Sequence, residues 1–116
     1  MKILYSDEDV IVFRVKTIKE ARAVSRLSRL AHFEDSRYSH FTRSAIRWDI
    51  TLVLGLMVKG QLAGYLAYSR SPFFKQIYVL PEYRNRGFEG LLAEVAEKNP
   101  GSVLISRGLR APGLKP

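Results

Sequence analysis

The chain has 116 residues, a formal net charge of +8 and no cysteine. This length suits a single domain, the lack of cysteine excludes disulfides and thiolate chemistry, and no apolar run approaches the roughly 20 residues of a membrane span. Acidic residues in the opening MKILYSDEDV stand where a signal peptide needs an apolar stretch, so we expect a cytoplasmic protein that does not contact membranes.

The first predicted elements are a strand and a helix. β-branched residues from Val10 to Val15 predict the strand, and Thr17-Ile18-Lys19-Glu20 has the spacing of a capping box, so a helix is expected to begin there. Apolar residues recur along this helix at intervals of three and four: Ile18, Ala21, Val24, Leu27, Leu30 and Ala31. Lys19, Arg22, Arg26 and Arg29 lie off that stripe, which predicts a basic outer face.

Six arginines lie between positions 22 and 47. Arginine forms planar, bidentate contacts with phosphate and carboxylate groups, and a field of this sign attracts polyanions. We therefore expect Arg22, Arg26 and Arg29 to face an acidic protein or a nucleic acid. The alternative is a basic helix face that contacts only solvent.

The middle of the chain predicts a hairpin. From His32 to Arg47 the periodicity weakens, and either a short second helix or a packed loop is expected there. An apolar run then extends from Leu52 to Val58, a turn follows at Lys59-Gly60-Gln61, and a second strand covers Leu62 to Tyr68. The remaining predicted elements are a strand at Phe74–Leu80, a helix at Arg86–Lys98 that stops at Asn99-Pro100-Gly101, and a short strand at Val103–Ile105.

The junction between the Phe74–Leu80 strand and the following helix has the pattern of a phosphate-binding site. A Pro81-Glu82-Tyr83 corner leads into Arg84-Asn85-Arg86-Gly87-Phe88-Glu89-Gly90 at the start of the helix. Backbone N–H groups at a helix N-terminus lack intrahelical partners and carry the positive end of the helix dipole, so they can hold a pyrophosphate. Alternatively, Gly87 and Gly90 serve only a loop with positive φ and a helix packed closely on a sheet.

This junction resembles the acetyl-coenzyme A signature of the GCN5-related N-acetyltransferases (GNAT). In that family Arg or Gln is followed by two residues, Gly, one residue, and then Gly or Ala. Val79-Leu80-Pro81-Glu82-Tyr83-Arg84 and Gly87 follow the pattern, whereas its last small residue falls on Glu89, with Gly90 one step later. The resemblance implies an α/β (α+β) fold over residues 1–106: a mixed, mostly antiparallel sheet with helices on both faces. Residues 107–116 are expected to form an irregular tail, so that the fold is shortened at its C-terminal end.

The resemblance also implies an activity, which is N-acetyl transfer from acetyl-CoA to an amine on a small molecule or a protein. Backbone groups of Tyr78 and Val79 would bond the pantetheine arm and polarise the thioester carbonyl. The remaining predicted contacts to the cofactor are Arg84, Asn85, Arg86, Gly87, Phe88 and Gly90. The alternative is a catalytically weak or inactive protein of this fold that binds a partner through its basic surface, and a shortened sheet also predicts a homodimer that covers the exposed edge.

The sequence does not identify a catalytic residue. The family often places a glutamate at the position of Phe74, and the tail lacks the helix that would carry a catalytic tyrosine. Tyr65, Tyr68, Tyr78 and Glu82 are neighbours of the predicted site, and packing within strands is the favoured role of the tyrosines. His32 and His40 form no recognisable metal motif, so no metal is expected.

Overall fold

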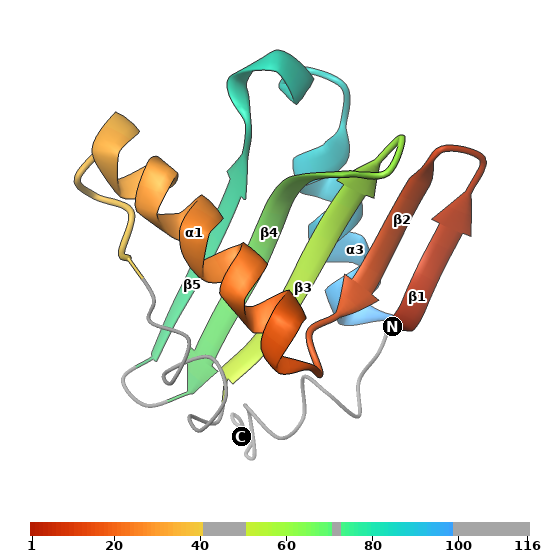
Figure 1. The fold of residues 1–116 in the computed structure, drawn as a ribbon, viewed down its shortest axis with the longest axis horizontal. Coiled ribbons are helices and arrows are strands. Elements are labelled where there is room, and N and C mark those ends of the chain that lie inside the picture. The colour runs from red at the N-terminus through yellow and green to blue at the C-terminus, as the bar shows by residue number, and fades with distance from the viewer. Residues whose placement is uncertain (41–50, 71–72, 99–116) are drawn as a thin grey trace.

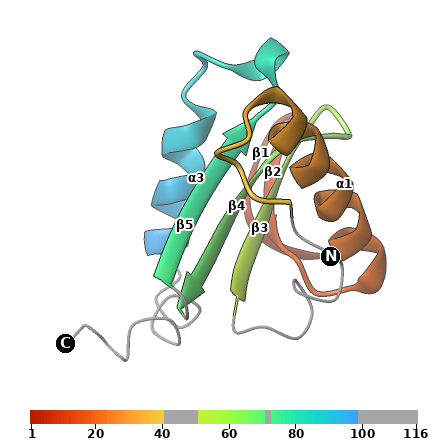
Figure 2. The same ribbon diagram turned by 90° about the vertical axis from the view of Figure 1, so that its left-hand side faces the viewer.

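The computed structural model describes residues 1–40, 51–70 and 73–98, which form one sheet with a helix on each face (Figures 1 and 2). Neighbouring strands pair antiparallel in the order β1-β2-β3-β4-β5. The predicted fold class is therefore confirmed. The strands are β1 (Lys2–Asp7), β2 (Val10–Arg14), β3 (Thr51–Val58), β4 (Gln61–Arg70) and β5 (Phe73–Val79); the helices are α1 (Ile18–Glu34), α3 (Phe88–Glu97) and the 3-10 turn η1 (Pro81–Tyr83).

The central strand β3 is buried on both faces. Leu52, Leu54 and Leu56 pack on the α3 side together with Leu92 and Val95 of that helix. The opposite face carries Val53, which packs with Tyr65 and Tyr78 against apolar residues of α1. A strand covered on both faces shows a continuous apolar run instead of alternation, which explains why Leu52 to Val58 is recognisable in the sequence.

Helix α1 begins as predicted. Thr17 Oγ1 accepts from the Glu20 N–H at 3.1 Å, and Glu20 Oε1 accepts from the Thr17 N–H at 3.2 Å, so the capping box is present. Its buried side is narrower than the predicted stripe, because Ile18 and Leu30 are 44% and 54% exposed. The residues of α1 that are buried against the sheet are Ala21, Val24, Leu27, Ser28 and Ala31.

Strand β1 is absent from the sequence prediction. It pairs with β2 from Lys2↔Arg14 to Asp7↔Val10 through a turn in which Glu8 has a φ of 49°. None of its residues is fully buried, but Leu4 and Tyr5 pack against the core cluster that includes α3. Backbone pairing and these contacts together hold the strand at the sheet edge, and its apolar run from Ile3 to Tyr5 is too short to predict a strand. The first strand of the chain is therefore β1 and not the Val10–Val15 segment.

The β3–β4 hairpin is confirmed, with a turn of only two residues. Lys59 and Gly60 have φ angles of 52° and 80°, the left-handed pair that matches the twist of antiparallel strands. Gln61, predicted in the turn, already belongs to β4 and pairs with Val58. The pairing then shifts register between Leu56↔Gly64 and Met57↔Leu62, which leaves Ala63 as an extra residue in β4.

Helix α3 begins at Phe88, two residues later than predicted, because Gly87 takes a left-handed conformation (φ 83°) at the N-cap. The second helix or loop predicted between His32 and Arg47 lies partly outside the described residues. The strand predicted at 103–105 and the tail at 107–116 lie entirely outside them. Within the ranges that are described, no helix is long and apolar enough to cross a membrane.

A substitution at Gly55 tests the packing of β2 against β3. Gly55 pairs with Phe13, whose ring is 3% exposed, and a Cβ atom at position 55 would lie 2.3 Å from Phe13 Cζ. We predict that Gly55→Ala lowers the free energy of unfolding by about 1–3 kcal/mol because the confined ring must move. Urea denaturation measures the change. The same substitution in a Phe13→Leu background should cost less, and equal costs in both backgrounds would contradict this account.

Candidate functional site

The chain between β5 and α3 forms a compact turn followed by an open helix end. Tyr83 N–H donates to Leu80 O at 2.9 Å and Arg84 N–H to Pro81 O at 3.2 Å, and Asn85 then adopts a φ of 64°. The first hydrogen bond within α3 runs from Leu91 N–H to Gly87 O. The amides of residues 88–90 therefore precede the hydrogen-bonded part of the helix, and their dipoles add to its positive end.

A cavity of about 150 Å³ lies at this helix end. Tyr83 and Glu89 contribute to its wall alongside six of the residues predicted to contact a cofactor: Val79, Arg84, Asn85, Gly87, Phe88 and Gly90. Two other predicted residues are not part of this wall. The Tyr78 side chain is buried in the core, and the Arg86 guanidinium lies 5.6 Å from the centre of the Tyr83 ring.

The two glycines of the loop differ in what the fold requires. Gly87 has a φ of 83°, which favours glycine for conformational reasons alone. Gly90 has an ordinary helical position, and a Cβ atom there would meet no atom within 4 Å. Close packing of α3 on the sheet therefore does not explain the glycine at position 90. Glycine is also unfavourable inside a helix, so helix stability does not explain it either.

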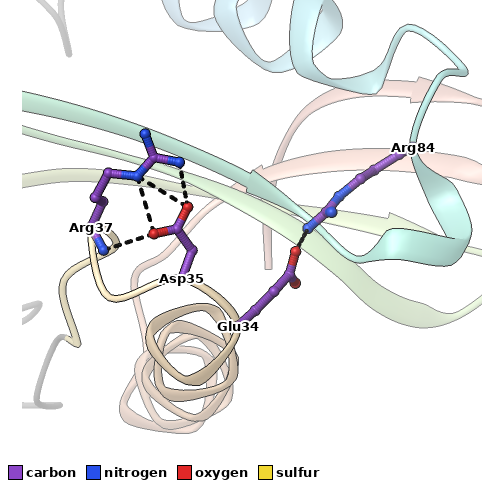
Figure 3. A network of polar contacts seen from close by, with 4 residues as sticks. All are labelled: Glu34, Asp35, Arg37 and Arg84. Atoms are coloured by element: carbon purple, nitrogen blue, oxygen red, sulfur yellow. Dashed lines mark hydrogen bonds and ion pairs between the residues drawn. The ribbon is translucent and has the colours of Figure 1, made fainter.

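The Arg84 side chain turns back toward the sheet and α1. Its Nε donates to Val79 O at 2.8 Å, and its Nη2 lies 2.7 Å from Glu34 Oε2 (Figure 3). The guanidinium also lies 5.4 Å from the centre of the Tyr78 ring. The resemblance predicts that Arg84 contacts the cofactor, whereas in this structure its side chain joins the loop to Glu34, the last residue of α1.

Tyr78 belongs to the same network. Its hydroxyl donates to Glu34 Oε1 at 2.8 Å, and its ring contacts Tyr38 edge-on with centroids 5.2 Å apart. Burial, followed by the hydrogen bond to Glu34, raises the pKa of Tyr78 to about 12. The hydrogen bonds from Tyr78 and Arg84 lower the pKa of Glu34, so neither group changes charge near neutral pH. The predicted packing role is confirmed for Tyr78 and Tyr65, which are 1% and 0% exposed.

A second, larger cavity of about 520 Å³ lies between β5 and the turn that follows α1. Its described wall consists of Asp35, Arg37, Tyr38, Ser39, Lys75, Gln76 and Ile77. In the described ranges no three His, Cys, Asp or Glu side chains gather to hold a metal, at either cavity or elsewhere.

Side-chain hydrogen bonds fix both sides of this cavity. Gln76 Oε1 accepts from the Ser39 N–H at 3.0 Å, and Gln76 Nε2 donates to the Tyr65 hydroxyl at 2.6 Å. Arg37 donates from its backbone N–H, Nε and Nη2 to the Asp35 carboxylate, and Figure 3 shows this pair beside the Glu34–Arg84 bridge. Glu34, Asp35 and Gln76 are not among the predicted site residues, because their partners lie on other elements or in an irregular turn.

The basic residues of α1 lie on a different surface. Lys19, Arg22, Arg26 and Arg29, which we call the basic face, are all exposed, and the helical period places them opposite the buried residues Ala21, Val24, Leu27, Ser28 and Ala31. No ion pair involves any of them within residues 1–40, 51–70 and 73–98. Phe33 follows Arg29 by one helical turn and is 75% exposed. The basic face is therefore unneutralised in the described part of the chain.

Comparison with protein-family models and with curated proteins gives no match, whereas solved structures do match. A ribosomal-protein-alanine N-acetyltransferase from Brucella melitensis biovar Abortus 2308 has a TM-score of 0.58 and 17% identity, covering 79% of this chain and 71% of that one. An aminoglycoside acetyltransferase from an uncultured soil metagenomic sample gives 0.59 and 17%, covering 80% and 72%. A GCN5-related N-acetyltransferase from Kribbella flavida gives 0.57 and 12%, covering 84% and 37%. Together with the antiparallel sheet and the loop that enters α3, these superpositions establish that the chain has the GNAT fold.

Proposed function

We propose that the protein transfers an acetyl group from acetyl-CoA to an amine. The observation that carries this proposal is the open helix end at residues 88–90, where Gly90 leaves space that the fold does not need. A glycine inside the first turn lets a ligand approach the backbone closely, which is the arrangement that pyrophosphate groups require. The named acetyltransferases that share the fold support the same reaction class.

The residues at this helix end can hold a pyrophosphate mainly through main-chain groups. The amides of Phe88, Glu89 and Gly90 would donate to phosphate oxygens, and the exposed Arg86 adds positive charge nearby. Arg84 is held by Glu34 and Val79, so its contribution is to fix the loop. Glu89 lines the same cavity, where its carboxylate competes with a ligand phosphate for the positive end of α3.

The edge of β5 supplies the groups for the thioester. Leu80 N–H donates to Ala63 O on the β4 side, whereas Val79 O accepts from Arg84. Successive residues of a strand direct their N–H and C=O groups to opposite sides, so the Val79 N–H also points away from β4. In our proposal this N–H polarises the carbonyl of the acetyl thioester, the amine nitrogen forms the new C–N bond, and coenzyme A departs as its thiol.

Positioning then accounts for most of the proposed rate enhancement. The 520 Å³ cavity borders β5 at residues 75–77, directly before Tyr78 and Val79, so we assign it to the acceptor amine. An acceptor held there would meet the thioester at the strand edge, and such proximity lowers the barrier without dedicated side chains. No described residue of the Glu34–Tyr78–Arg84 network has a pKa suited to general acid–base catalysis at neutral pH.

Two substitutions at the helix end test coenzyme A binding by calorimetric titration. Glu89→Ala should tighten binding by about fivefold, because it removes a like charge whose repulsion is on the order of 1 kcal/mol. Gly90→Ala should weaken binding by filling the approach to the backbone, yet raise the free energy of unfolding by up to about 1 kcal/mol. Glu97→Ala, at the opposite end of α3, is the charge-matched control. A flat titration for the folded parent and both variants would refute the cofactor assignment.

The pH dependence of the reaction tests the absence of a dedicated base. Thiol release with acetyl-CoA and a panel of amines should rise from pH 6 to 10 as the acceptor deprotonates, without a plateau near neutrality. The reason is that Glu34, with its lowered pKa, stays ionised over this range and Tyr78, with a pKa of about 12, stays protonated. A bell-shaped profile near pH 7 would reveal a catalytic group outside the Glu34–Tyr78–Arg84 network, and no release with any amine would favour the second candidate function.

The second candidate function is binding of a nucleic acid through the basic face. Four unneutralised cations on one side of α1 form a continuous positive surface, and the exposed Phe33 adds an aromatic ring of the kind on which bases stack. An acidic protein would be attracted by the same charge, but it has no bases to stack on the Phe33 ring, so the ring favours a nucleic acid. This binding is independent of the acetyl-transfer proposal.

A gel-shift titration at several salt concentrations tests this second function. Changing Arg22, Arg26 and Arg29 to Ala should weaken binding to a single-stranded oligonucleotide and lower the log–log salt slope by about 2, at roughly 0.7 per lost phosphate contact. A variant with Lys2→Gln, Lys59→Asn and Lys98→Gln removes the same charge elsewhere and should retain most of the affinity. Equal binding by both variants would exclude the basic face, and a pull-down of acidic polypeptides alone would identify the other partner class.

A further inference from the structure

The large cavity lies along the outer edge of β5, and its assignment to the acceptor rests on the proposed acetyl transfer. β5 is the last strand of the sheet, and Leu80 N–H donates to Ala63 O at the end of the β4–β5 pair. Because backbone groups alternate sides along a strand, Lys75 and Ile77 direct both their N–H and their C=O away from β4. These groups have no backbone partner in the described part of the chain, so this edge can accept a further strand.

The 35–39 turn covers one side of this edge. The cavity of about 520 Å³ is bounded by this turn and by residues 75–77, and its volume is within the range of small-molecule sites. Gln76 Oε1 accepts from the Ser39 N–H at 3.0 Å, and the Tyr38 ring packs edge-on against Tyr78. These contacts hold the turn on the α1 side of β5, so the cavity is formed before any ligand binds.

The charges around the cavity do not select its ligand. Hydrogen bonds from Arg37 lower the pKa of Asp35 to about 2, so the two charges of this ion pair balance at neutral pH. Lys75 lies opposite Tyr68 in the β4–β5 pair, and Tyr68 packs on the α3 side of the sheet. Opposite residues share a face, so the Lys75 side chain is on the other face from the turn. The main-chain groups of β5 are therefore the distinctive feature of this wall.

We infer that the acceptor is the N-terminal amine of a polypeptide whose first residues bind to β5 as an added strand. The outward groups of Lys75 and Ile77 are about 7 Å apart along the strand, which matches alternate residues of an extended chain. In an antiparallel arrangement, residue 2 of the polypeptide exchanges both backbone bonds with Ile77, and residue 4 does so with Lys75. The terminal amine then lies beside Val79, where the thioester carbonyl is proposed to be held.

The end of β5 is the reason for a terminal amine instead of a lysine side chain. Val79 O accepts from Arg84 Nε at 2.8 Å, and the Val79 N–H is assigned to the thioester. An added strand therefore has no backbone group left to pair with after Ile77, so its chain ends there. The amine nitrogen bonds to the acetyl carbon, the C–S bond breaks, and the proton lost by the nitrogen leaves with the thiol.

Alanine peptides test the inference by thiol release with acetyl-CoA, with kcat/KM expressed per fraction of neutral amine. The tetrapeptide amide should react about tenfold faster than alaninamide, because it adds backbone hydrogen bonds to the edge of β5. N-methylation of residue 2 should remove this advantage, since that N–H donates to Ile77 O. N-methylation of residue 3, whose N–H is directed away from β5, is the matched control and should retain the advantage.

Lys75→Pro tests the same contact from the side of the protein. It removes an N–H that points away from β4, so the β4–β5 pairing is kept, as proline on an edge strand allows. The ratio of tetrapeptide to alaninamide kcat/KM should fall about threefold to tenfold. Lys75→Ala, which keeps this N–H, should preserve the ratio. Circular dichroism checks that both variants are folded, and the N-methylated peptides decide the inference if Lys75→Pro is not.

Equal kcat/KM for the two N-methylated tetrapeptides, or no advantage over alaninamide, would overturn the inference while leaving acetyl transfer intact. If no amine reacts, acetyl transfer fails and binding decides the inference. The tetrapeptide should then move the NMR amide signals of Lys75 and Ile77, and its form N-methylated at residue 2 should not; equal effects, or none, would overturn it. Slow hydrogen exchange at these two amides in a stable dimer would also overturn it, because a second copy would then cover the edge.

Discussion

Burial of β3 on both faces is the constraint on which the rest of the structure depends. Because this strand is apolar toward α1 and toward α3, neither helix can leave without exposing one side of the sheet to water. The two helices are thereby fixed relative to β5, which lies two strands away in the sheet. Both cavities occur where β5 meets a segment adjoining one of these helices.

The Glu34 carboxylate links the two sides of this arrangement. It accepts from Tyr78 on the sheet and pairs with Arg84 on the loop that enters α3, although it belongs to α1. The side chains of Glu34 and Arg84 are about one third exposed, whereas Tyr78 is buried. Because their contacts join α1, β5 and the loop before α3, we assign the network a positioning role. By occupying Arg84 it leaves the helix end to backbone groups, which is why the proposed phosphate site depends on Gly90 and Glu89 more than on an arginine.

The proposed activities use separate surfaces of one small domain. The acetyl donor would follow the free side of β5, the acceptor would approach from the turn after α1, and a nucleic acid would contact the outer face of α1 (Figure 2). The positive charge of the chain contributes to the first and the last of these through different residues, Arg86 near the helix end and the basic face on α1. Variants of one surface therefore test one proposal without disturbing the others.

Elements whose signals are local could be predicted from the amino-acid sequence. The capping box at Thr17, the two-sided apolar run of β3 and the glycine loop before α3 depend on neighbouring residues, so periodicity and turn chemistry reveal them. The partners of Glu34 and Gln76 and the inward turn of Arg84 depend on how distant segments of the chain pack together. Glu34 and Arg84 are distant in the chain, and so are Ser39 and Gln76. The sequence pattern around a charged or amide side chain does not indicate which distant residue it will contact. β1 was likewise not predicted, because its apolar run from Ile3 to Tyr5 is only three residues long and the strand is completed by backbone pairing with β2.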